Sequence, residues 1–188
     1  MLTVPYLDRN CSTQSLTFDN NDKLPRALTQ CLADRVEDQW WRYMADFLWW
    51  DGRRVLRFRR GYGWDGASVP TGVRWYCNPG DYPAATGPHD YGYGYHWLEV
   101  WDTIRNRWAF VKVTKSETDA LWWQILDHHY RVRITKRFVL WEAVRVFGWG
   151  SWLSHGCNGK CKSCDPLDNA RDCPYEDVPP QPSEFIKE

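Results

Sequence analysis

An Asp-Gly pair between two strand-like segments places the strongest constraint on how the N-terminal half of this chain can fold. Aromatic and apolar side chains dominate from Gln39 to Trp50, Asp51-Gly52 interrupts them, and a second segment runs from Arg53 to Arg60. The Asp-Gly dipeptide suits a type I′ turn because both central residues of that turn have positive φ. We therefore expect a β-hairpin here, with a helix over residues 36–49 as the alternative.

Further along the chain, the apolar pattern changes from that of strands to that of helices. Residues 96–102 and 107–113 alternate apolar and polar side chains, which predicts a second hairpin. A helix is expected to begin at Ser116, because Asp119 three residues later gives a variant of the capping box. A third helix is expected over Thr135 to Phe147, ending at the glycines that follow.

A shorter helix is expected to carry His89 and Asp90, with Pro83 or Pro88 in its first turn. Adjacent residues of a helix point about 100° apart, so His89 and Asp90 cannot serve the same partner. We expect His89 to face Asp119 on the neighbouring helix and Asp90 to face a cation. The alternatives are a histidine that is only hydrogen-bonded and an Asp119 that only caps its own helix.

These residue types suit hydrolysis of an ester without a protein nucleophile. A carboxylate of Asp119 on one ring nitrogen of His89 would fix the tautomer and leave the other nitrogen able to take a proton from water. Water would then attack an ester carbonyl, and the developing oxyanion needs a positive partner. Asp65 and Asp90, with main-chain oxygens of the glycine-rich segment, are hard oxygen ligands suited to Ca²⁺.

Four motifs in order connect the sequence with known families: Asp65-Gly-Ala-Ser-Val-Pro70, His89-Asp90-Tyr91, Thr118-Asp119-Ala120 and Ala143-Val-Arg-Val-Phe-Gly148. This pattern resembles an uncharacterised family found in bacteriophages and prophages. To a lesser degree, the same order resembles the secreted prokaryotic phospholipases A2. Those enzymes have an Asp in a loop, a His-Asp-x-x-Tyr helix and a later helix with an Ile-Asp pair.

The phospholipase resemblance implies both a fold and a set of roles. The implied fold class is α+β, with N-terminal β-hairpins, a phospholipase-A2-like three-helix core and an irregular Cys-rich C-terminal tail. His89 would be the general base and Asp119 its orienting partner. Tyr91 and Trp141 would line or support the site. The implied Ca²⁺ ligands are Asp65, the Gly66 carbonyl and Asp90.

Four of the seven cysteines gather near the C-terminus, after His155: Cys157, Cys161, Cys164 and Cys173. Their spacing suits a tetrahedral Zn²⁺ site. Disulfides and free thiols are the alternatives. Disulfides are favoured if the protein leaves the cell as part of a particle. In either form, the cluster is expected to hold together a tail with little core of its own.

Length and composition indicate one core domain with an extension at each end. We expect an irregular arm over residues 1–38, the core over residues 39–153, and a Cys-rich, acidic, Pro-rich tail over residues 154–188. The 24 basic and 24 acidic residues cancel, which excludes a global field that draws the protein to nucleic acid. The 14 Trp residues would supply the core and an apolar groove or a subunit interface.

Two functions are expected from these features. The first is a Ca²⁺-dependent ester hydrolase that acts on lipid of the bacterial envelope. The second is a structural virion component, in a tail, neck or baseplate, that binds other phage proteins through the arm and the tail. The start of the sequence has no secretion signal, and no apolar stretch reaches the roughly 20 residues of a membrane span, so we expect a soluble protein in the host cytoplasm or the virion.

Overall fold

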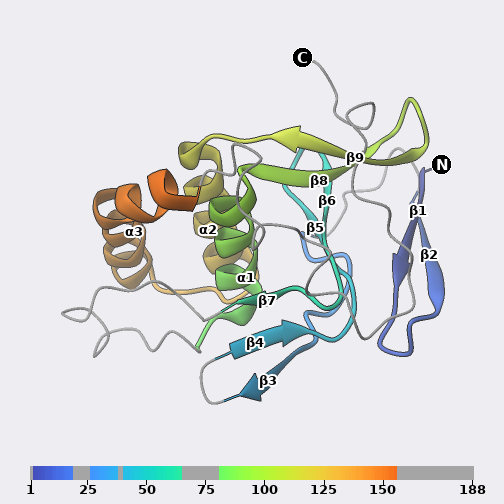
Figure 1. The fold of residues 1–188 in the computed structure, drawn as a ribbon, viewed down its shortest axis with the longest axis horizontal. Coiled ribbons are helices and arrows are strands. Elements are labelled where there is room, and N and C mark those ends of the chain that lie inside the picture. Colours follow the sequence, from blue (N-terminus) through green and yellow to red (C-terminus); the bar gives the residue numbers. More distant parts are fainter. Residues whose placement is uncertain (1, 19–25, 38–39, 65–80, 156–188) are drawn as a thin grey trace.

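The computed structural model describes residues 2–18, 26–37, 40–64 and 81–155, which form three antiparallel sheets and three helices (Figure 1). Strands β1 (Leu2–Leu7) and β2 (Thr13–Phe18) pair as a hairpin, and β3 (Ala33–Glu37), β4 (Trp40–Tyr43) and β7 (Gly63–Trp64) form a second sheet. The third sheet has the order β5 (Phe47–Trp50), β6 (Val55–Phe58), β8 (Trp97–Asp102), β9 (Arg107–Lys112). The helices are α1 (Pro83–Tyr95), α2 (Lys115–His128) and α3 (Ile134–His155).

The four-stranded sheet is a middle layer with both faces buried. Along β5, Phe47 and Trp49 join the core shared with the helices, whereas Leu48 between them packs with the β1–β2 hairpin. The two sides of β6 divide in the same way, with Leu56 toward the helices and Val55 toward the hairpin. Figure 1 shows the helices on one side of this sheet and β1–β2 on the other. Two-sided burial explains why the sequence of β5 is continuously apolar.

The phospholipase-A2-like three-helix core expected from the sequence is wrong. The main core cluster includes strand side chains such as Tyr43, Phe58, Trp64 and Val100, packed against all three helices. The fold is therefore mixed and mostly antiparallel, because these large strand side chains need a sheet face as well as helices to leave water.

Both expected hairpins exist, but the first has a different turn. β5 pairs with β6, so the alternative of a helix over residues 36–49 is wrong. The turn spans four residues rather than two, because the Asp51 carboxylate accepts hydrogen bonds from the N–H groups of Arg53 and Arg54, each 2.7 Å long. Gly52 supplies the positive φ, 103°. The second hairpin, β8 with β9, is confirmed.

The N-terminal segment is more regular than expected. The β1–β2 hairpin buries Val4 against the sheet, and the Leu7 N–H donates a 2.8 Å hydrogen bond to the buried carboxylate of Asp46. The expectation of an irregular arm over residues 1–38 is therefore wrong for these strands. The domain boundaries at 39–153 and 154–188 stay predictions.

The basic segment around β6 is partly buried in an ion cluster. Glu99 on β8 is buried opposite Arg57, and both Arg57 and Arg59 donate two hydrogen bonds to its carboxylate. Burial alone would raise the pKa of Glu99, but the two guanidinium groups lower it to about 2. The cluster thus ties β6 to β8 through charge as well as through the sheet.

Two helices extend past glycine or proline residues that were expected to limit them. α1 begins at Pro83 and contains Pro88. α3 continues through Gly148, whereas the sequence suggested an end at Phe147. A side chain at Gly148 would collide with the Tyr93 hydroxyl of α1, so this glycine allows the two helices to pack closely rather than ending α3.

Candidate functional site

The antiparallel contact between α1 and α2 brings His89 and Asp119 together. The Nε2 atom of His89 lies 3.4 Å from Oδ1 of Asp119, and both residues are less than 5% exposed. The His89 ring also packs on Tyr93 and Trp122, with centroid separations of 4.1 and 4.9 Å. The expected pairing of these two side chains is therefore present, and its catalytic role stays a prediction.

Gly92 on α1 permits this close approach. A Cβ atom at position 92 would lie 2.6 Å from Cγ2 of Thr118, which precedes Asp119 on α2. Because ordinary contacts between carbon atoms are about 3.5–4.0 Å, only glycine fits against Thr118 without a shift of one helix. The sequence thus sets the spacing of α1 and α2 at the level of the His89–Asp119 pair.

Two further residues complete the surroundings of Asp119. The Tyr93 hydroxyl donates a 2.8 Å hydrogen bond to Oδ1, and the Lys115 ammonium donates a 2.7 Å hydrogen bond to Oδ2. Lys115 also donates to the main-chain oxygen of Val144, which connects the group to α3. Sequence reasoning missed both residues. The signal was available, since Tyr93 follows His89 by four residues and Lys115 precedes Asp119 by four, which places each pair on one helix face.

Asp119 does not cap its helix. The N-cap of α2 is Thr114, whose side chain accepts a hydrogen bond from the Glu117 N–H, while the Glu117 carboxylate accepts one from the Thr114 N–H. Asp119 lies one turn further along and points into the interior. The capping alternative for Asp119, with Ser116 as the N-cap, is therefore wrong.

Asp90 also lies close to His89, contrary to expectation. Its Oδ1 atom is 3.4 Å from Nδ1 of His89, so each ring nitrogen faces a carboxylate. We expected Asp90 to turn away from His89 toward a cation, but its side chain reaches back to the ring edge that Asp119 leaves open.

The groups around His89 and Asp119 favour the charged forms of both residues. Burial alone would lower the pKa of His89, but its contacts with Asp119 and Asp90 raise it above the ordinary value of 6.5. Burial would raise the pKa of Asp119, but His89, Lys115 and Tyr93 lower it. His89 Nε2 makes no regular hydrogen bond to a described residue, so its 3.4 Å contact with Asp119 acts mainly as a charge interaction.

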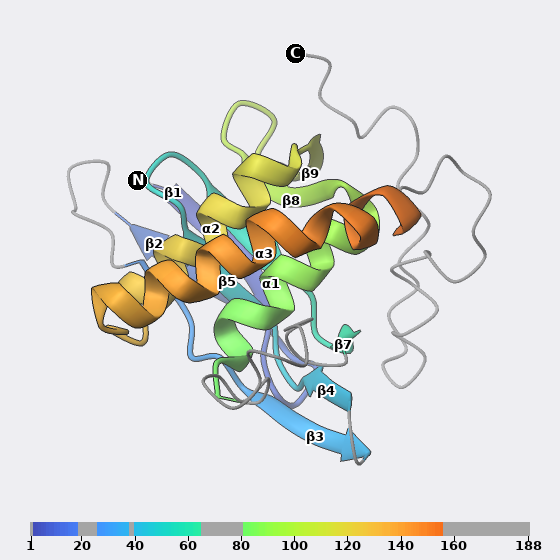
Figure 2. The same cartoon turned by 90° about the vertical axis from the view of Figure 1, so that its left-hand side faces the viewer.

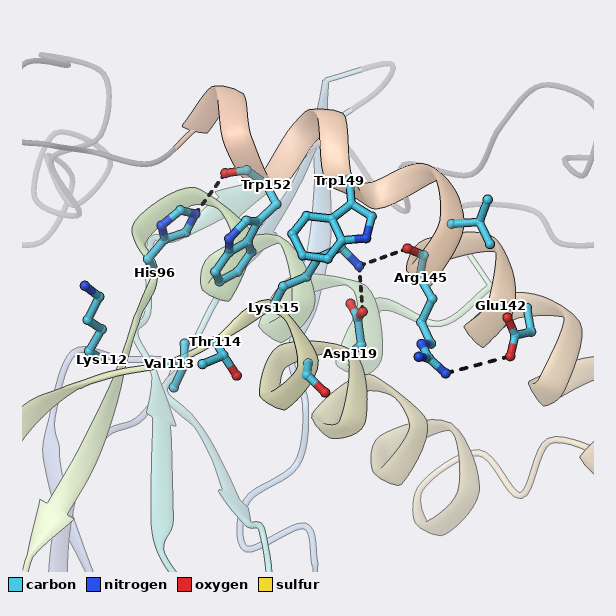
Figure 3. A pocket seen from close by; sticks show the side chains of 12 residues that line it. His96, Lys112, Val113, Thr114, Lys115, Asp119, Glu142, Arg145, Trp149 and Trp152 are labelled. Carbon is cyan, nitrogen blue, oxygen red and sulfur yellow. Dashed lines mark hydrogen bonds and ion pairs between the residues drawn. The ribbon is translucent and has the colours of Figure 1, made fainter.

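An open pocket of about 770 Å³ lies on the far side of Asp119 (Figure 3). Its lining includes Lys115 and Asp119 from α2, together with Arg145, Trp149 and Trp152 from α3. His89 is not among the described residues that line it. The Asp119–Lys115 ion pair therefore borders the pocket, whereas His89 does not.

The remaining predicted site residues fall into two groups. Tyr91 packs against Phe58 and Tyr62 in the sheet–helix core, and Trp141 packs against Trp123 on the outer helices, so neither touches the His89–Asp119 pair through a described contact. The predicted metal ligands outside the described residues are Asp65, Gly66, Cys157, Cys161, Cys164 and Cys173. Within the described ranges, no group of three or more His, Cys, Asp or Glu side chains is placed to hold a metal ion.

The structure thus defines a class of protein: an antiparallel sheet protein with a buried His-Asp-Lys-Tyr group between two of its helices. Residues 41–144, more than half of the chain, match the model of a family described as "Protein of unknown function (DUF1353)", so the chain belongs to the DUF1353 family. The same comparisons found no match among curated proteins or solved structures. None of the described helices combines the length and apolar character needed to span a bilayer.

Proposed function

We propose that the protein hydrolyses a carboxylic ester, with His89 as the general base. The observation that carries this proposal is the 3.4 Å contact of His89 Nε2 with Asp119, inside a buried group of four titratable residues. Such clusters, with several shifted pKa values in one place, are typical of functional sites. The fold itself carries none of this argument, because a fold does not determine an activity.

In the proposed reaction, Nδ1 of His89 accepts the proton of a water molecule as the water oxygen attacks the ester carbonyl carbon. Collapse of the tetrahedral intermediate breaks the bond to the alcohol oxygen, which takes the proton back from the ring. The products are a carboxylic acid and an alcohol. The Nδ1–Asp90 distance of 3.4 Å exceeds the usual N–H···O range of about 2.7–3.2 Å, and the proposed reaction requires water to take the place of Asp90 at this buried nitrogen.

Asp119, Tyr93 and Lys115 act as positioning residues in this proposal. Asp119 holds the Nε2 edge of His89, and the hydrogen bonds from Tyr93 and Lys115 fix the orientation of the carboxylate. The neutral ring prevails only above the raised pKa of His89, so the reaction is expected to accelerate as the pH rises above 6.5. The reacting nitrogen faces Asp90, so the pocket beyond Asp119 is not the substrate site.

Binding of Ca²⁺ is proposed separately from ester hydrolysis. Of the expected ligands, Asp90 alone lies within the described residues, and one carboxylate does not form a site for an ion that takes roughly six to eight oxygen ligands. No step of the proposed reaction depends on the ion. The Zn²⁺ site at Cys157, Cys161, Cys164 and Cys173 likewise remains a proposal from their spacing.

The substrate that we propose is an ester of an envelope lipid, and we place the protein in a bacteriophage or prophage context. The order His89-Asp90-x-x-Tyr93 supports the lipid, because it follows the His-Asp-x-x-Tyr pattern of phospholipases A2 and because Tyr93 contacts Asp119. The phage context is supported by the order of the four motifs alone.

The test is the release of fatty acid from phospholipid in mixed micelles by the full chain, with Ca²⁺ and with a chelator in its place. Replacement His89→Gln is expected to lower the rate about 100-fold or more, the usual contribution of a general base. His128→Gln is the matched control, since His128 is exposed at the end of α2. If the unaltered chain releases no acid in either condition, or if His89→Gln retains the rate, hydrolysis with this base is wrong.

A second candidate function, assembly into a virion, is favoured by one observation. Of the eight exposed large apolar side chains of the described residues, seven lie on α3. Concentration of apolar surface on one element marks an interaction site. Assembly predicts that the protein copurifies with particles and that His89→Ala leaves infectivity unchanged. Absence of the protein from particles would contradict it.

A further inference from the structure

One side of α3 has an apolar stripe that the described fold leaves largely exposed. Ile134, Phe138, Trp149 and Leu153 are each more than half exposed, whereas Leu140 and Val144 on the inward face are buried. Figure 2 shows α3 in front of α1 and α2 as the outermost helix of this side. The inward face therefore supplies most of the packing that holds α3 in place. At one end of the stripe, Trp149 also borders the pocket, with the Lys115 ammonium 5.3 Å from the centre of its ring.

Two charged residues lie in the middle of this stripe. Glu142 and Arg145 are 40% and 51% exposed and form a long ion pair of 4.0 Å with each other. The Arg145 guanidinium lies 4.4 Å from the centre of the Trp141 ring, which holds it along the helix surface. Two charged side chains at the centre of an apolar stripe disfavour its burial in lipid, because both would lose their contact with water there.

The order of residues along the stripe is symmetric. Counting from the midpoint between Ala143 and Val144, Glu142 and Arg145 are equally distant, as are Phe138 and Trp149, and Ile134 and Leu153. With about 100° of rotation per residue, these six positions fall within an arc of about 100° on one side of the helix. A second α3 helix running in the opposite direction would therefore place apolar against apolar and acid against base.

We propose that this face of α3 binds the α3 helix of a second copy of the chain, in an antiparallel pair about a two-fold axis. Such an interface is self-complementary because each contact occurs twice. Phe138 of one copy packs against Trp149 of the other, Ile134 against Leu153, and Glu142 pairs with Arg145 on both sides of the axis. The proposal does not depend on ester hydrolysis, so either can fail alone.

Charge-swap variants of the full chain test this arrangement by sedimentation equilibrium. Glu142→Arg and Arg145→Glu each place like charges across the axis, and each is expected to raise the dimer dissociation constant about tenfold or more. A mixture of the two variants restores opposite charges across the axis, so it is expected to form a heterodimer. Rescue between two different chains cannot come from a change within one helix.

A pair of surface variants tests how much the apolar side chains of α3 contribute to the dimer. Phe138→Asp is expected to weaken the dimer. Ile104→Asp, in the turn between β8 and β9, removes an even more exposed apolar side chain and is expected to have no effect on it. Circular dichroism and the melting temperature confirm that each variant is folded. A monomeric unaltered chain, or a mixture of the charge variants that stays monomeric, would overturn the proposal. Binding of the unaltered chain to phospholipid vesicles, with loss of that binding in Phe138→Asp, would instead assign the face to lipid.

Discussion

Lys115 donates a 2.7 Å hydrogen bond to Asp119 one helical turn away, and both side chains are almost fully buried. This contact neutralises the carboxylate that faces His89 and links α2 to α3 through the Val144 carbonyl. The most prominent residue pair in the sequence, His89 and Asp119, thus depends on a cation that the motif does not contain.

Replacement Asp119→Asn is expected to destabilise the protein, because it leaves the Lys115 ammonium buried without a counter-charge. Breaking a buried ion pair typically costs about 3–5 kcal/mol, and because this pair borders an open pocket we expect a cost at or below the lower end, about 2–3 kcal/mol. Denaturant unfolding measures the loss. Adding Lys115→Met to Asp119→Asn is expected to recover part of it, and no recovery would show that the ion pair is not the cause.

Replacement Gly92→Ala is expected to push α1 and α2 apart, because the added Cβ would lie 2.6 Å from the Thr118 side chain. Overpacking of this kind costs about 1–3 kcal/mol. The matched control is Gly94→Ala on the same helix, which meets no atom within 4 Å and should be neutral or stabilising by up to about 1 kcal/mol. Combining Gly92→Ala with Thr118→Ala should restore stability, because the second change removes the Thr118 atoms that the added Cβ would meet most closely. The melting temperatures of the variants measure these effects.

Tyr93 and Tyr91 give a paired test of the hydrogen bond to Asp119. Tyr93→Phe removes a 2.8 Å bond to a carboxylate and is expected to cost about 1.5–3 kcal/mol and to lower the hydrolysis rate. The Tyr91 hydroxyl is buried and forms no hydrogen bond with a described residue, so Tyr91→Phe should leave the free energy of unfolding unchanged or raise it. Equal losses in the two variants would contradict this assignment.

Glu99 is expected to make stability depend on pH in the acid range. Its pKa is about 2 in the folded protein against an ordinary 4.5, so the stabilisation is full above about pH 4.5 and disappears as the pH falls toward 2. At roughly 1.4 kcal/mol for each pKa unit, the effect amounts to about 3 kcal/mol. The difference in free energy of unfolding between the unaltered chain and Glu99→Gln should therefore shrink by this amount. A difference that stays constant with pH would contradict the assignment.

Local patterns in the sequence predicted some elements well. Apolar and polar residues alternate over residues 96–102 and 107–113, as is typical of strands, and this predicted the β8–β9 hairpin. The placement of His89 against Asp119 followed from helix geometry and the poor solvation of a lone carboxylate among apolar residues.

The start of α2 and the end of α3 could not be predicted, because at each place the same sequence pattern fits two different structural roles. Thr114-x-x-Glu117 and Ser116-x-x-Asp119 both fit a capping box, and only the structure shows that the first one forms. Gly148 looked like a helix end, although it serves the contact with Tyr93. The aromatic segment before Asp51 does not alternate apolar and polar residues, because the middle sheet is buried on both faces. Without that alternation, the sequence did not predict that strands supply much of the core.

The most direct measurement of the central claim is a ¹H–¹⁵N spectrum of the histidine side chains across a pH titration, with His89→Gln to assign the signals. We expect the pKa of His89 to lie above 6.5 and its neutral ring to carry the proton on Nε2, toward Asp119, which leaves Nδ1 as the base. A neutral ring with its proton on Nδ1, or a pKa of His89 below 6.5, would contradict the proposed role of this pair.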